Sequence, residues 1–309
     1  MRYAKLGCTG LDCSLLGFGT WQIGGGRWKG LETEESIAVL RHAAEFGVNI
    51  FDAAIVYGQY RGDLNEERSR SLELLGAAFG GSQRQEVIIN LKLGQVDEYS
   101  HRAIYEPRHM VEELGRALKE LKTDYVDICL VHAPTIAQIR DGRALSVVQT
   151  IQAMGGARFA GYSIEAEPEH AKLALAQEID VLMLQYNLLD RECEPIFERA
   201  AEQGVGVIVG GPFKRGYLTG EFSQVSDLPL SDNYWSWNLQ YARAKVEATL
   251  RRAVALREEA GGAVQLRKRA LNHVLGKHGV ASVVVGHRSR HEVSENAQSI
   301  GEVGQDSYA

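Results

Sequence analysis

Short apolar runs alternate along this chain with stretches in which apolar residues return at helical spacing. Eight of the runs, rich in Val, Ile and Leu, are predicted as strands, at residues 15–19, 48–52, 87–91, 126–131, 159–162, 181–186, 205–209 and 281–285. Near-continuous apolar strands are typical of a parallel sheet that is covered on both faces. Because a helical pattern follows most of these runs, we predict repeated strand–helix units.

The helical patterns have recognisable starts, faces and stops. The first is predicted to have Thr33 as its N-cap and to stop at Gly47. Another is expected to use Val111, Leu114, Leu118 and Leu121 as its apolar face. The remaining helices are predicted to end near Phe79, to cover 144–153, to begin at Pro168, and to cover 195–202, 240–260, 264–276 and 290–298.

Eight consecutive strand–helix units without a break in composition favour a closed barrel over an open doubly wound sheet. We therefore predict the α/β class and a single (β/α)8 TIM barrel domain over residues 1–309. The segment before the barrel, Met1 to Ser14, alternates around Thr9-Gly10. It predicts an N-terminal β-hairpin that closes the bottom of the barrel.

Two long loops, residues 58–69 and 213–239, follow the carboxyl ends of predicted strands. Barrel enzymes place their sites at this end of the strands, so both loops are expected to contact a substrate. The second loop contains Tyr234, Trp235 and Trp237. These aromatic residues would either form an apolar lid over the substrate or pack on the barrel top.

Composition narrows the classes of partner. The chain has 309 residues, 45% of them hydrophobic and 24% charged, which is ordinary for a soluble enzyme. Its formal net charge of -6 argues against a nucleic-acid or membrane-surface binder. No apolar run approaches the roughly 18 residues that span a bilayer. The four cysteines form no C-x-x-C pair, so we expect a reducing cytoplasm and no metal site. With nucleic acids and membranes disfavoured by the charge, we expect a small molecule as the ligand.

Reactive side chains stand at or just after three consecutive predicted strands. Asp52, Lys92 and His132 occupy these positions, and Tyr57 follows Asp52 by five residues. Neighbouring strands lie about 4.8 Å apart, so these side chains are expected to converge at one mouth of the barrel. Each residue alone is more often a cap, a surface partner or a satisfied core residue. Their convergence on the functional face weakens that interpretation.

This combination of groups suits the reduction of a carbonyl. Tyr57 would donate the proton that the developing alkoxide needs, and the Lys92 ammonium is expected to lower the pKa of that phenol. Asp52 would keep Lys92 charged inside the barrel. His132 would hydrogen-bond and polarise the carbonyl oxygen.

The chain resembles the aldo-keto reductase family along nearly its whole length. The motifs that carry the resemblance are Lys5-Leu-Gly-Cys-Thr-Gly-Leu11, Gly17-Phe-Gly-Thr-Trp21, Phe51-Asp-Ala-Ala-Ile-Val-Tyr-Gly58, Leu91-Lys-Leu-Gly94, Asp124-Tyr-Val-Asp127, Leu184-Gln-Tyr-Asn187, Arg215-Gly-Tyr-Leu-Thr-Gly220 and Val285-Gly-His-Arg288 with Asn296. The resemblance implies a (β/α)8 barrel that binds a nicotinamide cofactor across its mouth without a Rossmann fold. The absence of a strand-associated G-x-G-x-x-G agrees with that expectation.

The resemblance also implies roles for individual residues. Asp52, Tyr57, Lys92 and His132 match the catalytic tetrad, with Tyr57 as general acid in reduction and general base in oxidation. The residues implied in cofactor binding are Ser163 and Gln185 at the carboxamide, Gly19, Thr20 and Trp21 at the nicotinamide and substrate, Gly210 and Pro212 after the seventh strand, and Lys214, Arg215, Leu218, Gly286, Arg288, Glu292 and Asn296 toward the pyrophosphate and adenosine.

Three positions depart from the family pattern. Ile164 stands where the family usually has Asn, and Gly210 stands where an aromatic residue usually stacks on the nicotinamide. The glycine pair at 210–211 resembles the aldose and lactol dehydrogenases of the family. Glu292 replaces the usual Arg or Gln near the adenosine ribose, where a carboxylate would repel a 2′-phosphate.

These features leave three functions open. The leading prediction is an aldehyde or ketone reductase that uses NADP(H), which the family's general habit favours over NAD(H). The second is an NAD-linked dehydrogenase of an aldose or lactol, which Gly210 and Glu292 favour. The third is a regulatory subunit that binds the cofactor and turns over little, since a fold alone does not imply catalysis. The sequence specifies no oligomeric state.

Overall fold

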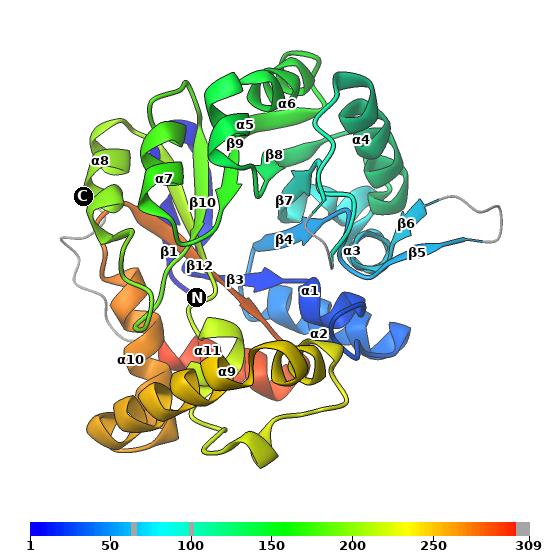
Figure 1. The fold of residues 1–309 in the computed structure, drawn as a ribbon. Helices are drawn as coiled ribbons and strands as arrows, with labels where there is room; N and C mark the ends of the chain where they lie inside the picture. Colours follow the sequence, from blue (N-terminus) through cyan, green and yellow to red (C-terminus); the bar gives the residue numbers. More distant parts are fainter. Residues whose placement is uncertain (63–66, 99–101, 301–309) are drawn as a thin grey trace.

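Parallel strands form a closed barrel at the centre of the molecule (Figure 1). The computed structural model describes residues 1–62, 67–98 and 102–300. Within them the barrel has eight strands in the order β10-β11-β12-β3-β4-β7-β8-β9. Their bounds are β3 Leu16–Gly19, β4 Ile50–Ala54, β7 Ile88–Leu93, β8 Val126–His132, β9 Ala157–Ile164, β10 Val181–Gln185, β11 Gly206–Gly210 and β12 Val280–Gly286. The predicted (β/α)8 barrel is therefore confirmed.

Helices surround this barrel and alternate with its strands along the chain (Figure 1). Their bounds are α1 Trp21–Gly24, α2 Thr33–Glu45, α3 Arg70–Phe79, α4 Pro107–Leu121, α5 Ile136–Asp141, α6 Arg143–Ala153, α7 Pro168–Ala174, α8 Glu194–Glu202, α9 Asn233–Ala260, α10 Ala263–Leu275 and α11 Arg290–Ser299. Pro168 is the first residue of α7, as predicted, because proline's missing N–H costs nothing there. The described helices include none that is long and apolar enough to cross a membrane.

Two details of the helix predictions are wrong. Thr33 is the first residue of α2 instead of its N-cap, and its hydroxyl accepts a hydrogen bond from Arg70 on α3. In α4 the buried stripe includes Met110, and Val111 is 44% exposed. The stripe is therefore rotated by one residue at its start, because the curved barrel wall and α3 select the face that packs.

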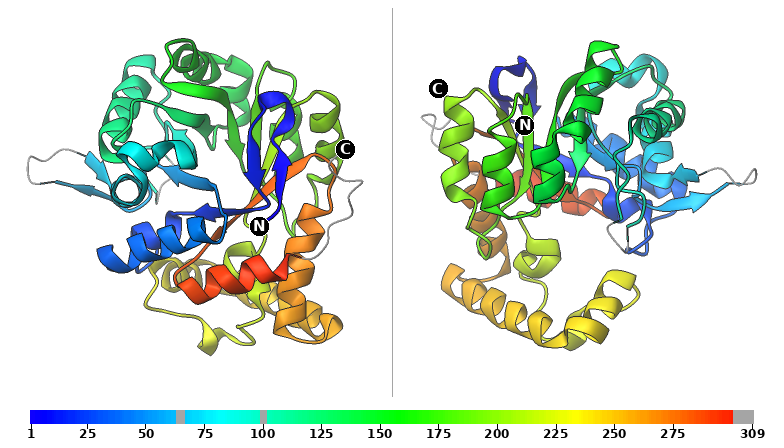
Figure 2. Two further views of the ribbon diagram at one scale, coloured as in Figure 1. Left: turned by 180° about the vertical axis from the view of Figure 1, so that it is seen from behind. Right: turned by 45° about the horizontal axis from the view of Figure 1, so that its top comes forward.

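The predicted N-terminal hairpin is present and lies at the end of the barrel where the strands begin. β1 Tyr3–Lys5 pairs antiparallel with β2 Asp12–Ser14 through the short 3-10 helix η1 Gly7–Thr9. The N–H of Cys8 in η1 donates to the carbonyl of Gly204, just before β11, at 2.8 Å. Figure 2 shows the hairpin and α9 on opposite sides of the barrel.

Both long loops contain more structure than predicted. In residues 58–69, β5 Gln59–Arg61 pairs with β6 Glu67–Ser69, and this ribbon points away from the barrel in Figure 1. Residues 63–66 lie outside the described part. The second loop is shorter because α9 begins at Asn233, before the predicted 240, after the 3-10 helices η3 Lys214–Thr219 and η4 Val225–Asp227.

The early start of α9 has a tertiary cause. Its first turns contain Tyr234 and Trp235, which are buried against other segments and do not form a regular apolar stripe. The backbone departs from helical angles at Ala242, which further breaks the periodicity. Hydrophobic spacing detects a helix only where one face packs along its length, so this start was missed.

Candidate active site

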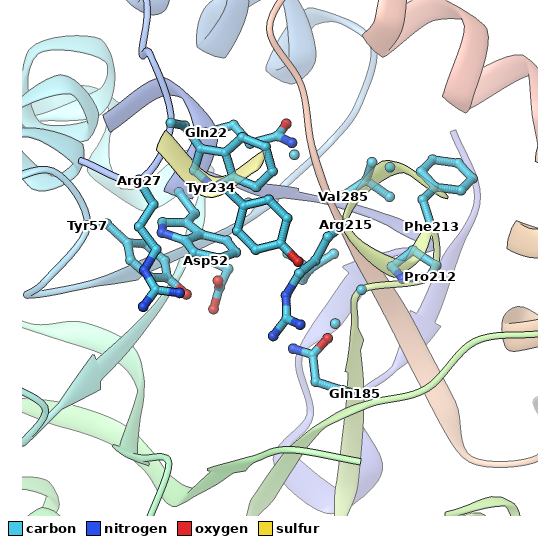
Figure 3. Close-up of a pocket in the computed structure, with 18 of the residues that line it drawn as sticks. Gln22, Arg27, Asp52, Tyr57, Gln185, Pro212, Phe213, Arg215, Tyr234 and Val285 are labelled. Atoms are coloured by element: carbon cyan, nitrogen blue, oxygen red, sulfur yellow. The ribbon is translucent and has the colours of Figure 1, made fainter. Parts of the chain in front are cut away.

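A pocket of about 550 Å³ occupies the mouth of the barrel at the carboxyl ends of the strands. This volume falls within the roughly 300–1,000 Å³ usual for small-ligand sites. Figure 3 shows Tyr57, Asp52 and Arg27 on one side of it, Pro212, Phe213 and Val285 on the other, and the Tyr234 ring between them. The pocket is thus bounded by strand ends, by the segment after α1 and by the start of α9.

A buried ion pair forms the base of the pocket. The Lys92 ammonium donates to both oxygens of Asp52, at 2.6 and 2.5 Å, and Asn90 donates to Asp52 Oδ1 at 2.8 Å. Burial alone would lower the pKa of Lys92, but the charges of Asp52 and Tyr57 outweigh it and raise that pKa. This direction favours the charged form of Lys92.

Tyr57 lies beside this pair. The Lys92 Nζ is 4.8 Å from the centroid of the Tyr57 ring, and the His132 ring meets that ring edge-on at 6.1 Å. Burial raises the pKa of Tyr57 to about 12, Lys92 acts to lower it, and Asp52 and Glu98 add to the increase. Lys92 thus acts in the predicted direction, but burial, which the sequence did not reveal, outweighs it and leaves the pKa above its ordinary value. The phenol is consequently protonated at neutral pH, which is the form that a proton donor needs.

His132 is held at the end of β8 through its backbone. Tyr105 donates its hydroxyl to the His132 carbonyl at 2.6 Å. The next residue, Ala133, has a φ of 50° and donates its N–H to the Ser163 carbonyl at 2.8 Å. This left-handed conformation is costly for a residue with a Cβ and persists where the surrounding structure enforces it. The imidazole is therefore placed by the strand end and its neighbours.

The structure brings most of the predicted cofactor-binding residues into the same pocket as the tetrad. Those that line it are Gly19, Trp21, Ser163, Gln185, Gly210, Pro212, Arg215, Gly286, Arg288, Glu292 and Asn296. Three others do not line it: the Thr20 hydroxyl donates to the Asp52 carbonyl, Lys214 pairs with Asp190, and Leu218 is fully buried. These three act on the pocket only through the residues that they hold.

The glycine pair after β11 leaves room for the side chain of Gln185. Gln185 on β10 pairs in register with Gly210 on β11. A Cβ added to Gly210 would lie 2.7 Å from Gln185 Nε2, too close for a real side chain. In Figure 3 the Gln185 amide points into the pocket. A side chain at position 210 would therefore have to displace the amide of Gln185.

At the far end of the pocket the charge of Arg288 is already paired. Its guanidinium donates to Asp232 at 2.6 Å, and its backbone N–H donates to Glu292 at 2.7 Å. Asp232 is fully buried and also accepts the backbone N–H of Lys29 at 2.8 Å. An anion that approached Arg288 would therefore compete with two carboxylates.

Several pocket residues were not singled out from the sequence. They are Gln22, Arg27, Trp28, Gln95, Glu98 and Phe213, together with Asp232 and Arg267 farther along. No periodicity or motif marks them, because they reach the pocket from loops and helix starts whose path depends on the rest of the fold. Tyr234 and Trp235, expected as lid or packing residues, both line the pocket, whereas Trp237 is 46% exposed.

Across the described part of the chain, no group of three or more His, Cys, Asp and Glu side chains could hold a metal ion. His287 and His291 have helical spacing, but His287 is fully buried while the His291 side chain is 80% exposed.

Comparison with known proteins places these residues in a family context. The model of the aldo/keto reductase family matches residues 15–307. The chain is 26% identical over 303 residues to the uncharacterized oxidoreductase YqkF of Bacillus subtilis (strain 168), covering 97% of this chain and 91% of that protein. It is 26% identical over 241 residues to the NADH-specific methylglyoxal reductase of Escherichia coli (strain K12), covering 72% and 71%. Among solved structures, the holo form of an aldo-keto reductase from Bacillus halodurans matches with a TM-score of 0.73 and 26% identity, covering 97% and 91%.

Proposed function

Because this chain belongs to the aldo/keto reductase family, we propose that it transfers a hydride between a nicotinamide cofactor and a small carbonyl or alcohol, with Tyr57 as general acid and base. The observation that carries the proposal is the contact of Tyr57 with the buried Lys92–Asp52 pair in the pocket at the barrel mouth. Burying an ion pair is costly, so its position beside a phenol favours a catalytic purpose over a stabilising one.

Polar side chains that line the pocket support the proposal that it binds a dinucleotide. Gln185 and Ser163 present polar side chains at the glycine-lined side of the mouth, where a nicotinamide carboxamide would bind. Arg215 lines the middle of the pocket and would contact the phosphates, and Asn296 lies toward the adenosine end. When bound, the reduced nicotinamide supplies the hydride, which no side chain of the protein can provide.

The chain's own residues handle the proton and the carbonyl oxygen. Tyr57 donates its hydroxyl proton to the oxygen as the carbonyl is reduced and recovers it in the reverse direction. Lys92, 4.8 Å from the Tyr57 ring, stabilises the phenolate that this transfer leaves. His132 hydrogen-bonds the carbonyl oxygen from the opposite edge of Tyr57 and orients it. Asp52 and Asn90 hold Lys92 in place.

The test is a Tyr57→Phe variant assayed with small aldehydes and ketones. We expect turnover to fall by a factor of about 10² to 10⁴, which is the usual contribution of a positioned general acid. Cofactor affinity, measured by fluorescence titration, should stay close to that of the unchanged protein. Unchanged turnover would sink the mechanism. Cofactor binding without measurable turnover in either protein would instead support the regulatory-subunit function.

A second function, an NAD-linked dehydrogenase of a sugar or lactol, is favoured by one specific contact. If Arg288 meets the adenosine ribose as proposed, its pairing with Asp232 leaves it less free to bind a 2′-phosphate. Titration with NADPH and, separately, with NADH distinguishes the two. Tighter NADPH binding supports the carbonyl reductase, whereas tighter NADH binding supports the dehydrogenase and directs the assay to NAD-linked oxidation of sugars.

A further inference from the structure

After β7, residues 94–96 lie beside residues 102–104, and Glu98 lies at the wall of the pocket. At the base of this segment, Gly94 donates its N–H to Glu113 Oε2 at 2.8 Å and accepts the N–H of Ile104 at 2.7 Å. These bonds hold both arms of the segment against α4. Glu98, near the tip, lines the pocket and is 8% exposed.

Glu98 contacts the substrate end of the pocket through Trp21. Its Oε1 accepts the indole N–H of Trp21 and, at 3.4 Å, the backbone N–H of Arg27. Burial raises the pKa of Glu98, and the bonds from Trp21 and Arg27 oppose that rise. Burying a carboxylate carries a desolvation cost, so the contact with the indole needs a compensating purpose.

Trp21 is fixed at its backbone but has aromatic neighbours around its ring. The preceding residue, Thr20, donates its N–H and its hydroxyl to the Asp52 carbonyl, at 3.0 and 2.8 Å. The Trp21 ring stacks on Tyr57, with centroids 5.9 Å apart and an interplanar angle of 27°, and meets Trp28 edge-on at 5.4 Å. Apolar contacts of this kind set the distance between rings but give no directional constraint on the rotation of the indole about its Cβ–Cγ bond. The indole N–H is the one group of Trp21 that can fix that rotation directionally.

We propose that Glu98 is a positioning residue for the substrate end of this pocket: by accepting the indole N–H it holds the Trp21 ring stacked on Tyr57 and so fixes the wall beside the phenol. The contact between Glu98 and Trp21 rests on geometry alone. Its expected effect on substrate binding rests also on the proposed function. A different role is that Glu98 only ties its own segment to Gly26–Arg27. That role would affect stability and leave substrate binding unchanged.

The kinetic test uses Glu98→Ala, Glu98→Gln and Trp21→Phe. Glu98→Ala should raise KM for the carbonyl substrate about 10-fold, the usual effect of losing a hydrogen bond to a charged group, with a smaller change in kcat and no change in cofactor affinity. Glu98→Gln keeps an acceptor oxygen and should restore KM to within about threefold of the unchanged protein. Combining Glu98→Ala with Trp21→Phe should cost no more than the larger single effect, because both remove the same bond.

Three outcomes of this test would overturn the proposal. They are a KM that stays unchanged in Glu98→Ala, a Glu98→Gln variant as impaired as Glu98→Ala, and single-variant effects that multiply in the double variant. Thermal unfolding of each variant shows whether it is folded before its KM is compared.

A second measurement is independent of activity. In a ¹H–¹⁵N NMR spectrum the indole N–H of Trp21, assigned by its loss in Trp21→Phe, should exchange slowly with solvent. It should shift and exchange faster in Glu98→Ala and remain slow in Glu98→Gln. An indole signal that is the same in Glu98→Ala and the unchanged protein contradicts the contact. If Tyr57→Phe retains turnover, the proposed function fails while this signal still decides the role of Glu98.

Discussion

The two halves of the pocket are built in different ways. The catalytic half, defined as Asp52, Tyr57, Asn90, Lys92 and His132, comes from the ends of the neighbouring strands β4, β7 and β8 and the residues beside them. Its charged groups Asp52 and Lys92 are buried 2.5–2.6 Å from each other, and Asn90 donates to Asp52 at 2.8 Å. Burial in this half means that few rotamers are available, which preorganises the proton donor.

The cofactor half, defined as Gln185, Gly210, Gly211, Asp232, Arg288 and Glu292, is assembled from distant segments. Asp232 and Arg288 are 56 positions apart, and Asp232 and Lys29 are 203 apart. Gly210 and Gly211 leave space there, and the charge of Arg288 is already paired with Asp232. The difference teaches that the residues proposed for catalysis are held by packing, while the residues proposed for cofactor binding would select a ligand through the space that they leave and the charges that already pair.

Breaking the ion pair should have the largest effect. A Lys92→Met variant leaves Asp52 buried without its cation, and we expect turnover to fall by at least about 10³ and the free energy of unfolding by about 3–5 kcal/mol. Urea unfolding and steady-state kinetics measure the two. The double variant Asp52→Asn with Lys92→Met should be equally inactive yet more stable than Lys92→Met. Equal stability of both variants would show that the pair is not desolvated as described.

Filling the glycine-lined space should impair the cofactor half alone. In a Gly210→Phe variant the new side chain would displace the Gln185 amide, and cofactor affinity should fall about 10- to 100-fold, in line with the cost of overpacking. With saturating cofactor, kcat should change far less. Gly115→Ala is the matched control, since an added Cβ there has no neighbour within 4 Å. Equal losses of affinity in the two variants would argue against a specific space at Gly210.

Asn90 offers a milder change within the catalytic half. Asn90→Leu removes the N–H that Asp52 accepts at 2.8 Å but also removes a buried Oδ1 that has no hydrogen-bond partner among the described residues. We expect kcat/KM to fall about 10-fold, while the free energy of unfolding changes by less than about 1.5 kcal/mol. A large loss of stability with unchanged kcat/KM would make Asn90 a core residue instead.

The effect that is smallest at neutral pH concerns His287, the residue that follows β12. Burial lowers the pKa of His287 to about 3, whereas an unfolded histidine titrates near 6.5. The unfolded chain therefore takes up the proton first, and the free energy of unfolding should fall as pH decreases from about 6.5 to about 3. His287→Phe should make this slope shallower by up to about 1.4 kcal/mol per pH unit. Unfolding curves at several pH values check it, and identical slopes would place the His287 ring in water.

Much of the fold and of the catalytic half was predictable from the sequence. The eight strands lie close to their predicted positions because β-branched runs record burial on both faces of each strand. Asp52, Lys92 and His132 converge because parallel strands bring their carboxyl ends to one mouth. These features could be predicted because they involve strands that are neighbours in the sheet and that recur in a repeating unit along the chain.

The tertiary structure decided the features that depend on contacts without a period. It placed Glu98 on Trp21, brought Asp232 to Arg288 and began α9 at Asn233. It also buried Tyr57 deeply enough to outweigh the lowering of its pKa by Lys92. Hydrophobic spacing reflects how a single element packs. It therefore predicts where the strands lie along the chain and which face of a helix is buried. Hydrophobic spacing does not predict how deeply a particular side chain is buried. It also does not predict which partner that side chain contacts in a loop 50 or more residues away, because both depend on the tertiary structure of the whole chain.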